Sequence, residues 1–193
     1  MIWLDTETYS EVPINHGTYK YTSNCEAMIW TSALDDGPVI AIDLTNDEHP
    51  WDVPDLRYAL LDPEHLATAH NSMFDRNVLK HSLGLNIAIP RWRDTMVQAF
   101  TLSLPGSLDK LCQIFKVNDD LAKMKDGKRL INLFCKPRPK NMKLRRATRL
   151  THPEDWASFI QYAINDTAAM REVAKKMPTW NYKGVELDLW HLD

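Results

Sequence analysis

Four acidic residues lie in three separate stretches of the sequence, each within or beside an apolar run. Asp5 and Glu7 are near the N-terminus, Asp75 follows a short mixed stretch, and Asp166 lies in the C-terminal third. Four carboxylates folded into one place repel one another and need cations to stay ionised side by side. Hard divalent metals such as Mg²⁺ prefer oxygen ligands. Two such metals can hold both the attacking and the leaving oxygen of a phosphodiester. The four acids therefore predict metal-dependent phosphoryl chemistry.

The spacing of these residues predicts which of them share a face of a strand or of a helix. Asp5 and Glu7 are two positions apart, so they share a face of a regular strand. Tyr162 and Asp166 are four positions apart and share a face of a helix. An unperturbed tyrosine has a pKa of about 10, so Tyr162 is better suited to orienting a water molecule than to accepting its proton. Asp75 lies near an expected strand-to-helix junction, where a helix N-terminus favours negative charge.

The elements around these residues predict a layered α/β domain. Strands are expected over residues 1–5 and 66–70, the first ending at Asp5. The β-rich runs at 28–34 and 38–44 flank Asp35-Asp36-Gly37, a pattern typical of a hairpin. Three antiparallel strands near the N-terminus follow from this pattern. Strands that come first and helices that come mostly later favour an α/β layered domain over strict alternation.

Helices are expected mainly in the second half of the chain. The longest carries apolar residues at helical spacing and ends before Pro178. Pro137 and Pro139 indicate a long loop over about 135–152, and residues 186–193 read as an amphipathic helix. The longest helix is expected over 153–176, and the others over 54–61, 72–82, 94–102, 108–115 and 126–134.

Composition fits one domain with a substantial core. The chain has 193 residues, of which 44% are hydrophobic and 25% charged, as in globular proteins. It contains no apolar run of about 18 residues, so no membrane span is expected. The acidic N-terminus does not resemble a signal peptide, which predicts a cytoplasmic protein. Cys25, Cys112 and Cys135 show no metal-ligand spacing and are expected to be free thiols.

Charge is distributed very unevenly along the chain. Residues 123–149 contain eleven Lys or Arg and one acid, so this segment carries +10 and the remainder −13, for the overall −3. A negatively charged protein that binds DNA needs a local basic surface of this kind. A solvated loop without a ligand is the alternative interpretation, and the sequence leaves the role of 135–149 open.

The acids belong to three short patterns in a fixed order. Asp-x-Glu alone occurs often by chance, but three patterns with their accessory residues are specific. Together they resemble the proofreading 3′–5′ exonucleases of the DEDD superfamily, in the tyrosine form, and most of all the exonuclease domain of family A, phage-type DNA polymerases. Further similar stretches begin at Gly17, Trp92, Leu108 and Lys123, so the resemblance covers nearly the whole chain. The three patterns are Asp5-x-Glu7, Asn71-x-x-x-Asp75 and Tyr162-x-x-x-Asp166.

The resemblance implies a fold and a set of site residues. The fold would be ribonuclease H-like, a mixed sheet of about five strands flanked by helices. Two divalent ions, Mg²⁺ or Mn²⁺, would be held by Asp5 bridging both, Glu7 on one, Asp75 on the second partly through water, and Asp166 completing the site. Tyr162 would orient the attacking water. Substrate contacts are expected from Thr6, Asn71, Phe74, Lys123 and Lys128.

Two neighbouring residues have competing interpretations. Phe74 could stack on a terminal base or belong to the core. His70 is expected to be a strand-end histidine with satisfied hydrogen bonds rather than a ligand.

The activity implied by the resemblance is removal of 5′-nucleoside monophosphates from single-stranded or frayed DNA 3′ ends, as in proofreading. Mismatched ends unpair at lower cost, which would favour their removal. Residues 1–193 would form one exonuclease domain, the N-terminal part of a longer polymerase, acting in the host cytoplasm if phage-encoded. Its partners would be a single-stranded DNA 3′ end and a linked or associated polymerase domain.

Two alternative functions remain open. A ribonuclease D-like RNA exonuclease shares the four acids and the tyrosine, and discrimination between RNA and DNA depends on contacts to the 2′-hydroxyl. A catalytically idle nucleic-acid-binding domain is the second alternative, which the presence of all four acids and Tyr162 disfavours.

Overall fold

A computed structural model gives the fold and describes residues 1–48, 52–117 and 126–192. Its centre is a five-stranded mixed sheet with the order β3-β2-β1-β4-β5. The first three strands pair antiparallel, whereas β4 and β5 run parallel to β1. The predicted mixed sheet with three initial antiparallel strands is therefore confirmed. The strands are β1 (Ile2–Tyr9), β2 (Glu26–Leu34), β3 (Ile40–Asp43), β4 (Ala67–Ala69) and β5 (Trp92–Asp94).

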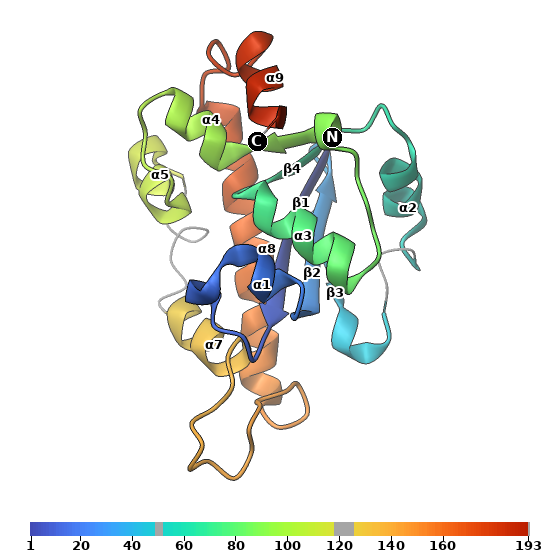
Figure 1. The fold of residues 1–193 in the computed structure, drawn as a ribbon, viewed down its shortest axis with the longest axis vertical. Helices are drawn as coiled ribbons and strands as arrows, with labels where there is room; N and C mark the ends of the chain where they lie inside the picture. The colour runs from blue at the N-terminus through green and yellow to red at the C-terminus, as the bar shows by residue number, and fades with distance from the viewer. Residues whose placement is uncertain (49–51, 118–125, 193) are drawn as a thin grey trace.

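Helices cover both faces of this sheet. Figure 1 shows the long helix α8 crossing behind the strands and α3 lying in front of them. Within the described residues, no helix is both long and apolar enough to cross a membrane. The α-helices are α1 (Thr18–Thr22), α2 (Pro54–Leu61), α3 (Ser72–Ser82), α4 (Thr95–Thr101), α5 (Leu108–Phe115), α7 (Gly127–Phe134), α8 (Pro153–Lys176) and α9 (Val185–Leu192).

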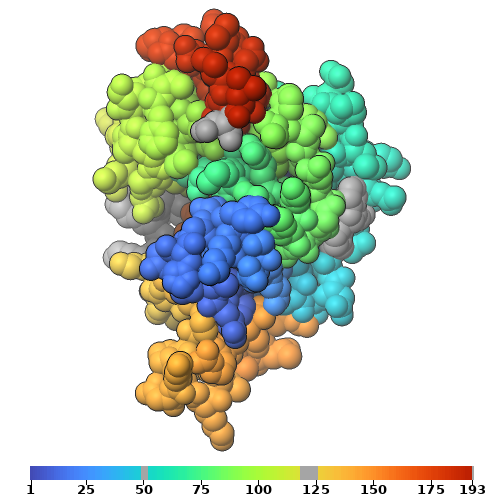
Figure 2. All heavy atoms as spheres, in the orientation of Figure 1, coloured from blue at the N-terminus to red at the C-terminus, as the bar shows by residue number. Residues whose placement is uncertain are grey.

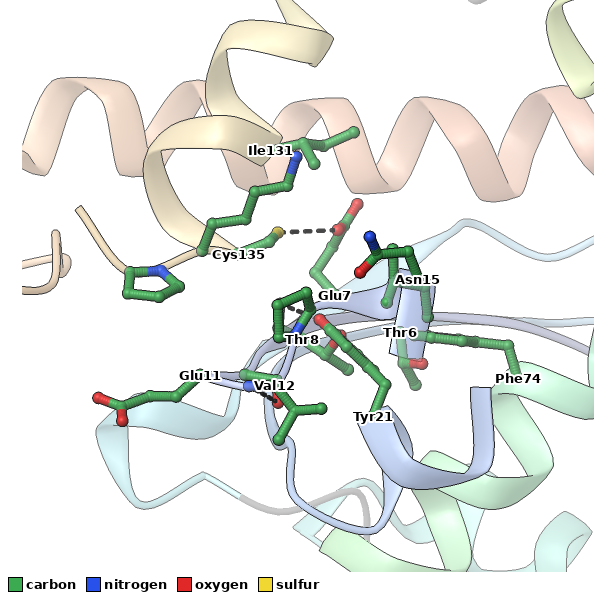
Figure 3. A pocket seen from close by; sticks show the side chains of 15 residues that line it. Thr6, Glu7, Thr8, Glu11, Val12, Asn15, Tyr21, Phe74, Ile131 and Cys135 are labelled. Atoms are coloured by element: carbon green, nitrogen blue, oxygen red, sulfur yellow. Dashed lines mark hydrogen bonds between the residues drawn. The ribbon is translucent and has the colours of Figure 1, made fainter. Parts of the chain in front are cut away.

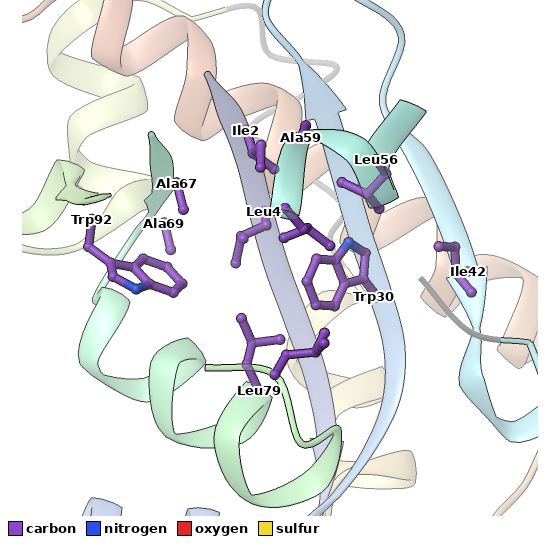
Figure 4. Close-up of a cluster of buried hydrophobic side chains, with 12 residues drawn as sticks. Ile2, Leu4, Trp30, Ile42, Leu56, Ala59, Ala67, Ala69, Leu79 and Trp92 are labelled. Atoms are coloured by element: carbon purple, nitrogen blue, oxygen red, sulfur yellow. The ribbon is translucent and has the colours of Figure 1, made fainter. Parts of the chain in front are cut away.

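Alternation along β1 decides which side chains meet which helix. Ile2 and Leu4 are fully buried in a cluster with Trp30, Leu79 and residues of α2 (Figure 4). Trp3 lies on the opposite face, where it packs in a cluster with Met170 of α8. Because strand side chains alternate with a period of two, Asp5 and Glu7 face α8, and Thr6 faces α3.

Two strand predictions need correction. The first strand was expected to end at Asp5, but β1 continues to Tyr9, because Asp5 and Glu7 pair in register with Thr31 and Ile29 of β2. The ladder with β2 therefore holds polar positions that would not favour a strand on their own. The expected strands also omitted β5, which is only three residues long and is held by pairing with β4.

The free edge of β1 creates room for the site. Strand β4 pairs with β1 at Ile2 and Trp3, and no other strand of the described residues lies beside the later part of β1 on that edge. The register with β2 shifts between Glu7 and Thr8, and such irregularities bend a strand and re-aim its side chains.

The expected helices are confirmed, and the starts of those expected at 94, 126 and 186 are shifted by one residue. Asp94 was expected to begin a helix; it ends β5 instead and caps α4, accepting hydrogen bonds from the backbone of Met96 and Val97 at 2.8 and 3.2 Å. Residues 135–152 contain no helix or strand, as expected of the long loop.

Candidate active site

Strand β1 and helix α8 bring three of the four acids together. Asp5 and Glu7 face α8, where Asp166 lies one helical turn from Tyr162. Asp166 and Asp5 both raise the pKa of Glu7, and Asp5 raises the pKa of Asp166, so these carboxylates lie within electrostatic range of one another. The expected convergence of the first and third patterns is thus present in the fold.

The fourth acid reaches the same place from helix α3. Asp75 is 2% exposed and lies in the first turn of that helix. The Thr6 hydroxyl donates a 2.7 Å hydrogen bond to Asp75 Oδ1. Thr6 lies between Asp5 and Glu7 in β1, so this contact brings Asp75 to the same part of the strand, and burial followed by the charge of Asp5 raises the pKa of Asp75. All four acids of the three patterns therefore share one site.

The N-terminus of α3 is held by Asp94, whose role sequence reasoning missed. Besides capping α4, the Asp94 carboxylate accepts hydrogen bonds from the backbone N–H groups of Asn71 and Ser72 at 3.1 and 2.6 Å. Asn71 takes a left-handed conformation with φ of 68°, which Asn tolerates better than most residues. Asp94 therefore fixes the turn that delivers Asp75. The Asp-Thr sequence before a helix signals an N-cap, but nothing local signals the link to α3.

Burial makes these carboxylates unusually weak acids. It raises the pKa of Asp5 to about 6 and, with repulsion from Asp5, that of Asp166 to about 7. The pKa values of Glu7 and Asp75 lie well above their ordinary range, again chiefly through burial and then through repulsion from neighbouring acids. Among the described residues, no Lys or Arg forms an ion pair with any of the four.

Oxygen donors of this kind fit hard divalent cations. Clustered carboxylates neutralise such ions, and the ions in turn relieve the repulsion between the carboxylates. In residues 1–48, 52–117 and 126–192, however, no three His, Cys, Asp or Glu side chains are positioned to hold a metal ion as they stand.

Tyr162 is confined between an aromatic ring and a glycine. Its ring stacks on Phe159 with centroids 6.3 Å apart and planes inclined by 8°. On another side lies Gly127, where an added Cβ would come within 2.5 Å of Tyr162 Cε2. Burial, followed by the charges of Asp166 and Glu7, raises the pKa of Tyr162 above its usual value. The phenol therefore keeps its proton at neutral pH, which suits orientation of a water rather than proton abstraction.

A cavity opens beside these residues. Its volume is about 580 Å³, within the range of small-molecule pockets. Of the four acids, Glu7 is the one that lines it, together with Thr6 and Phe74 (Figure 3). Phe74 lies 5.7 Å from Tyr21, measured between ring centroids, and is half-buried at the cavity wall instead of packing in the core.

Cys135 supports Glu7 from the other side of the cavity. Its thiol Sγ lies 3.8 Å from Glu7 Oε2, the geometry of a weak hydrogen bond (Figure 3). Burial and the charge of Glu7 raise the pKa of this thiol well above its usual value, so it remains a donor. All three cysteines are free thiols, as predicted. Their spacing in sequence gave no indication of the contact with Glu7.

The other predicted residues are placed as follows. Lys128 is exposed in the first turn of α7, whereas Lys123 lies outside the described residues. Asn71 contributes its backbone to the Asp94 contact, and its expected contact with substrate stays a prediction. His70 bonds Thr95 Oγ1 and the carbonyl of Gly106, both at 2.8 Å, which confirms it as a strand-end histidine with satisfied hydrogen bonds.

Comparison with known proteins gives two findings. The family model described as 3′–5′ exonuclease, of the DNA polymerase A type, matches residues 2–179. The DNA polymerase of Bacillus phage SP02 is 34% identical over 197 residues, an alignment that covers 98% of this chain and 30% of that polymerase. The chain thus spans less than a third of the length of this curated relative.

Proposed function

The chain belongs to the 3′–5′ exonuclease family of DNA polymerase A, and from this premise we propose that it removes nucleoside 5′-monophosphates from the 3′ end of single-stranded DNA. The observation that carries the proposal is the convergence of Asp5, Glu7, Asp75 and Asp166 beside a cavity large enough for a nucleotide. The match to a phage DNA polymerase supports DNA as the substrate.

In this proposal the four carboxylates would hold two divalent cations, Mg²⁺ or Mn²⁺. When bound, such ions supply Lewis-acid activation of water and stabilisation of the leaving oxygen. Asp5 is central to the group, because its charge acts on each of the other three acids. Tyr162, which retains its proton, orients the attacking water, so the site is of the tyrosine type.

The cavity residues position the terminal nucleotide. Phe74 offers an aromatic face on which any base can stack, which gives binding without sequence preference. The Thr6 hydroxyl is already engaged by Asp75, so Thr6 would contact the substrate through its backbone. Lys128 and Lys123 would contact substrate phosphates. A duplex end must fray to enter, and mismatched ends fray at lower cost, which gives a proofreading preference.

We further propose that residues 1–193 form one exonuclease domain linked to a polymerase domain, which would act in the host cytoplasm if phage-encoded. This proposal rests on the share of the phage polymerase that the chain covers.

The test uses 5′-labelled single-stranded DNA and RNA of the same sequence, with Mg²⁺ or Mn²⁺. A ladder that shortens from the 3′ end of DNA, and is absent with a chelator, is expected. The Asp75→Asn variant, which keeps the shape of the buried side chain, should lose this activity. Degradation of RNA alone would favour a ribonuclease D-like function, and degradation of neither substrate would favour a binding domain.

A further inference from the structure

One strongly charged segment is not explained by the chemistry of the four acids. Residues 136–149, here called the basic loop, contain seven Lys or Arg and no acid. Figure 1 shows this loop extending away from the sheet beyond α7, and Figure 2 shows it protruding from the body of the molecule. The basic residues are Lys136, Arg138, Lys140, Lys143, Arg145, Arg146 and Arg149.

The start of the basic loop lies at the rim of the cavity. Lys136 and Pro137 line the cavity together with Glu7. Cys135, the residue before the loop, contacts Glu7, and its carbonyl accepts a 3.4 Å hydrogen bond from the backbone of Ser10. The loop therefore begins where a nucleotide in the cavity would meet solvent.

Near its end, the basic loop is anchored to Glu26, the first residue of β2, and to Tyr9, the last residue of β1. Arg146 makes two hydrogen bonds to Glu26, at 2.6 and 2.9 Å. Its guanidinium also lies 4.1 Å from the centroid of the Tyr9 ring, at the last residue of β1. Both ends of the loop are thus fixed close to the strand that carries Asp5 and Glu7.

Between these anchors the loop has a defined shape and unneutralised charge. A 2.8 Å hydrogen bond from the backbone N–H of Arg138 to the carbonyl of Arg145 closes it. Lys140, Lys143 and Arg145 are exposed, and none of them forms an ion pair within the part of the chain that the structure describes. Like charges held together repel one another, and the phosphates of a polyanion relieve that repulsion.

We propose that the basic loop binds the phosphodiester backbone of single-stranded DNA on the 5′ side of the nucleotide in the cavity. This inference rests on the proposed function, because it takes the cavity to hold the 3′-terminal nucleotide. Because Lys136 and Pro137 line the cavity, a strand that leaves on their side meets the basic loop. The four acids repel its phosphates, and the basic loop supplies the opposing charge. Phosphate contacts carry no sequence information, as removal of any terminal nucleotide requires.

The test compares two variants with equal change in charge. The first is Lys140→Gln/Lys143→Gln/Arg145→Gln in the basic loop. The control removes two Lys and one Arg from exposed positions on α2, at the end of α3 and before α9: Arg57→Gln/Lys80→Gln/Lys183→Gln. Thermal unfolding should give the same midpoint for both variants and the parent, since all six side chains are exposed.

Two substrates separate the loop from the chemistry. The p-nitrophenyl ester of thymidine 5′-monophosphate has no nucleotide on its 5′ side, whereas a 15-residue oligothymidylate extends past the loop. We expect the loop variant to hydrolyse the ester as the parent does, but to bind the oligothymidylate roughly tenfold more weakly at low salt. In the loop variant, the plot of log affinity against log salt concentration, measured in chelator, should be less steep by about 2. This is the change expected when contacts to three phosphates of a single strand are lost.

The outcomes distinguish this inference from the proposed function. If the loop variant bound the oligothymidylate with the affinity and the salt slope of the parent, the inference would be overturned. An equal loss in the control variant would also overturn it, because net charge alone would then explain the effect. Failure of the parent protein to hydrolyse either substrate, with loop-dependent DNA binding retained, would overturn the proposed function and leave the loop as a DNA-binding surface.

Discussion

Asp5 and Glu7 are separated by Thr6, whose side chain points to the opposite face of β1 and bonds Asp75. Three consecutive residues therefore serve the site in two ways. The outer two present carboxylates toward α8, and the middle one holds the acid that arrives from α3. A shift of one residue in the register of β1 would exchange these faces and separate the acids.

Gly127 is a second single residue on which the site depends, because its lack of a side chain leaves room for the ring of Tyr162. We predict that Gly127→Ala lowers kcat about 10- to 100-fold, because the added methyl group displaces the phenol, and small misplacements of reacting groups are costly. Alanine is the better helix former, so helix propensity does not account for the loss. Steady-state rates on single-stranded DNA check this prediction.

A double-mutant cycle with Tyr162→Phe separates positioning from general destabilisation. If Gly127 acts by placing the hydroxyl, Gly127→Ala should change kcat less than about threefold in the Tyr162→Phe background, since neighbouring positions couple non-additively. The melting temperature should fall equally in both backgrounds. Full additivity of the two activity losses would show that Gly127 does not act through the phenol.

At the scale of elements, the site lies where β1, α3 and α8 meet, and each of these elements is held in place by different contacts. β1 is held by its ladder with β2, α8 is packed on that face through Trp156 and Phe159, and α3 is tied to β5 through Asp94. The chemistry depends on these supports, because the acids repel one another and would separate if any one of the elements moved.

Asp94 is the support with the clearest test. We predict that Asp94→Ala lowers the free energy of unfolding by about 3 kcal/mol, because four backbone N–H groups lose a buried charged acceptor. Activity measured well below the melting temperature should also fall, since the turn before Asp75 loosens. Urea denaturation and rate measurements check both effects.

The matched control is Asp55→Ala, which removes an exposed acid from the first turn of α2. Asp55→Ala should change the free energy of unfolding by no more than about 0.5 kcal/mol, as for most surface substitutions. Asp94→Asn retains one acceptor oxygen, so its loss of unfolding free energy should lie between those of Asp94→Ala and Asp55→Ala. Equal effects of the Asp94 and Asp55 substitutions would show that Asp94 is no more than an ordinary helix-terminal acid.

At the scale of the whole molecule, charge is separated into two regions. The buried acids form one, and the exposed basic loop, anchored beside them at both ends, forms the other. The buried group lowers the stability of the protein at neutral pH, since ionised carboxylates are held together away from water.

The stability of the metal-free protein should therefore depend on pH in a specific direction. Asp5 and Asp166 have folded-state pKa values of about 6 and about 7, raised from an ordinary 3.8. The folded state binds these protons more tightly than the unfolded state does. The resulting stabilisation is complete below about pH 4 and is lost as the pH rises to about 7. We predict that the melting temperature in chelator falls over this interval.

Asp5→Asn/Asp166→Asn provides the comparison, because its amides do not titrate. The variant should lose less stability than the parent between pH 5 and 7, both measured in chelator. Saturating Mg²⁺ should raise the melting temperature of the parent and leave that of the variant nearly unchanged. Parallel pH curves for the two proteins would contradict the raised pKa values.

The sequence by itself determined the parts of this protein that depend on few residues. The hairpin at Asp35-Asp36-Gly37 and the length of α8 follow from turn chemistry and local periodicity. Only the tertiary structure decided which residues support the acids. The Thr6–Asp75 and Cys135–Glu7 contacts join residues 69 and 128 positions apart. Such contacts depend on how the whole chain packs, and local patterns carry no signal for them. The same reason explains why β1 continues past its acids: pairing with β2 overrides their low strand preference.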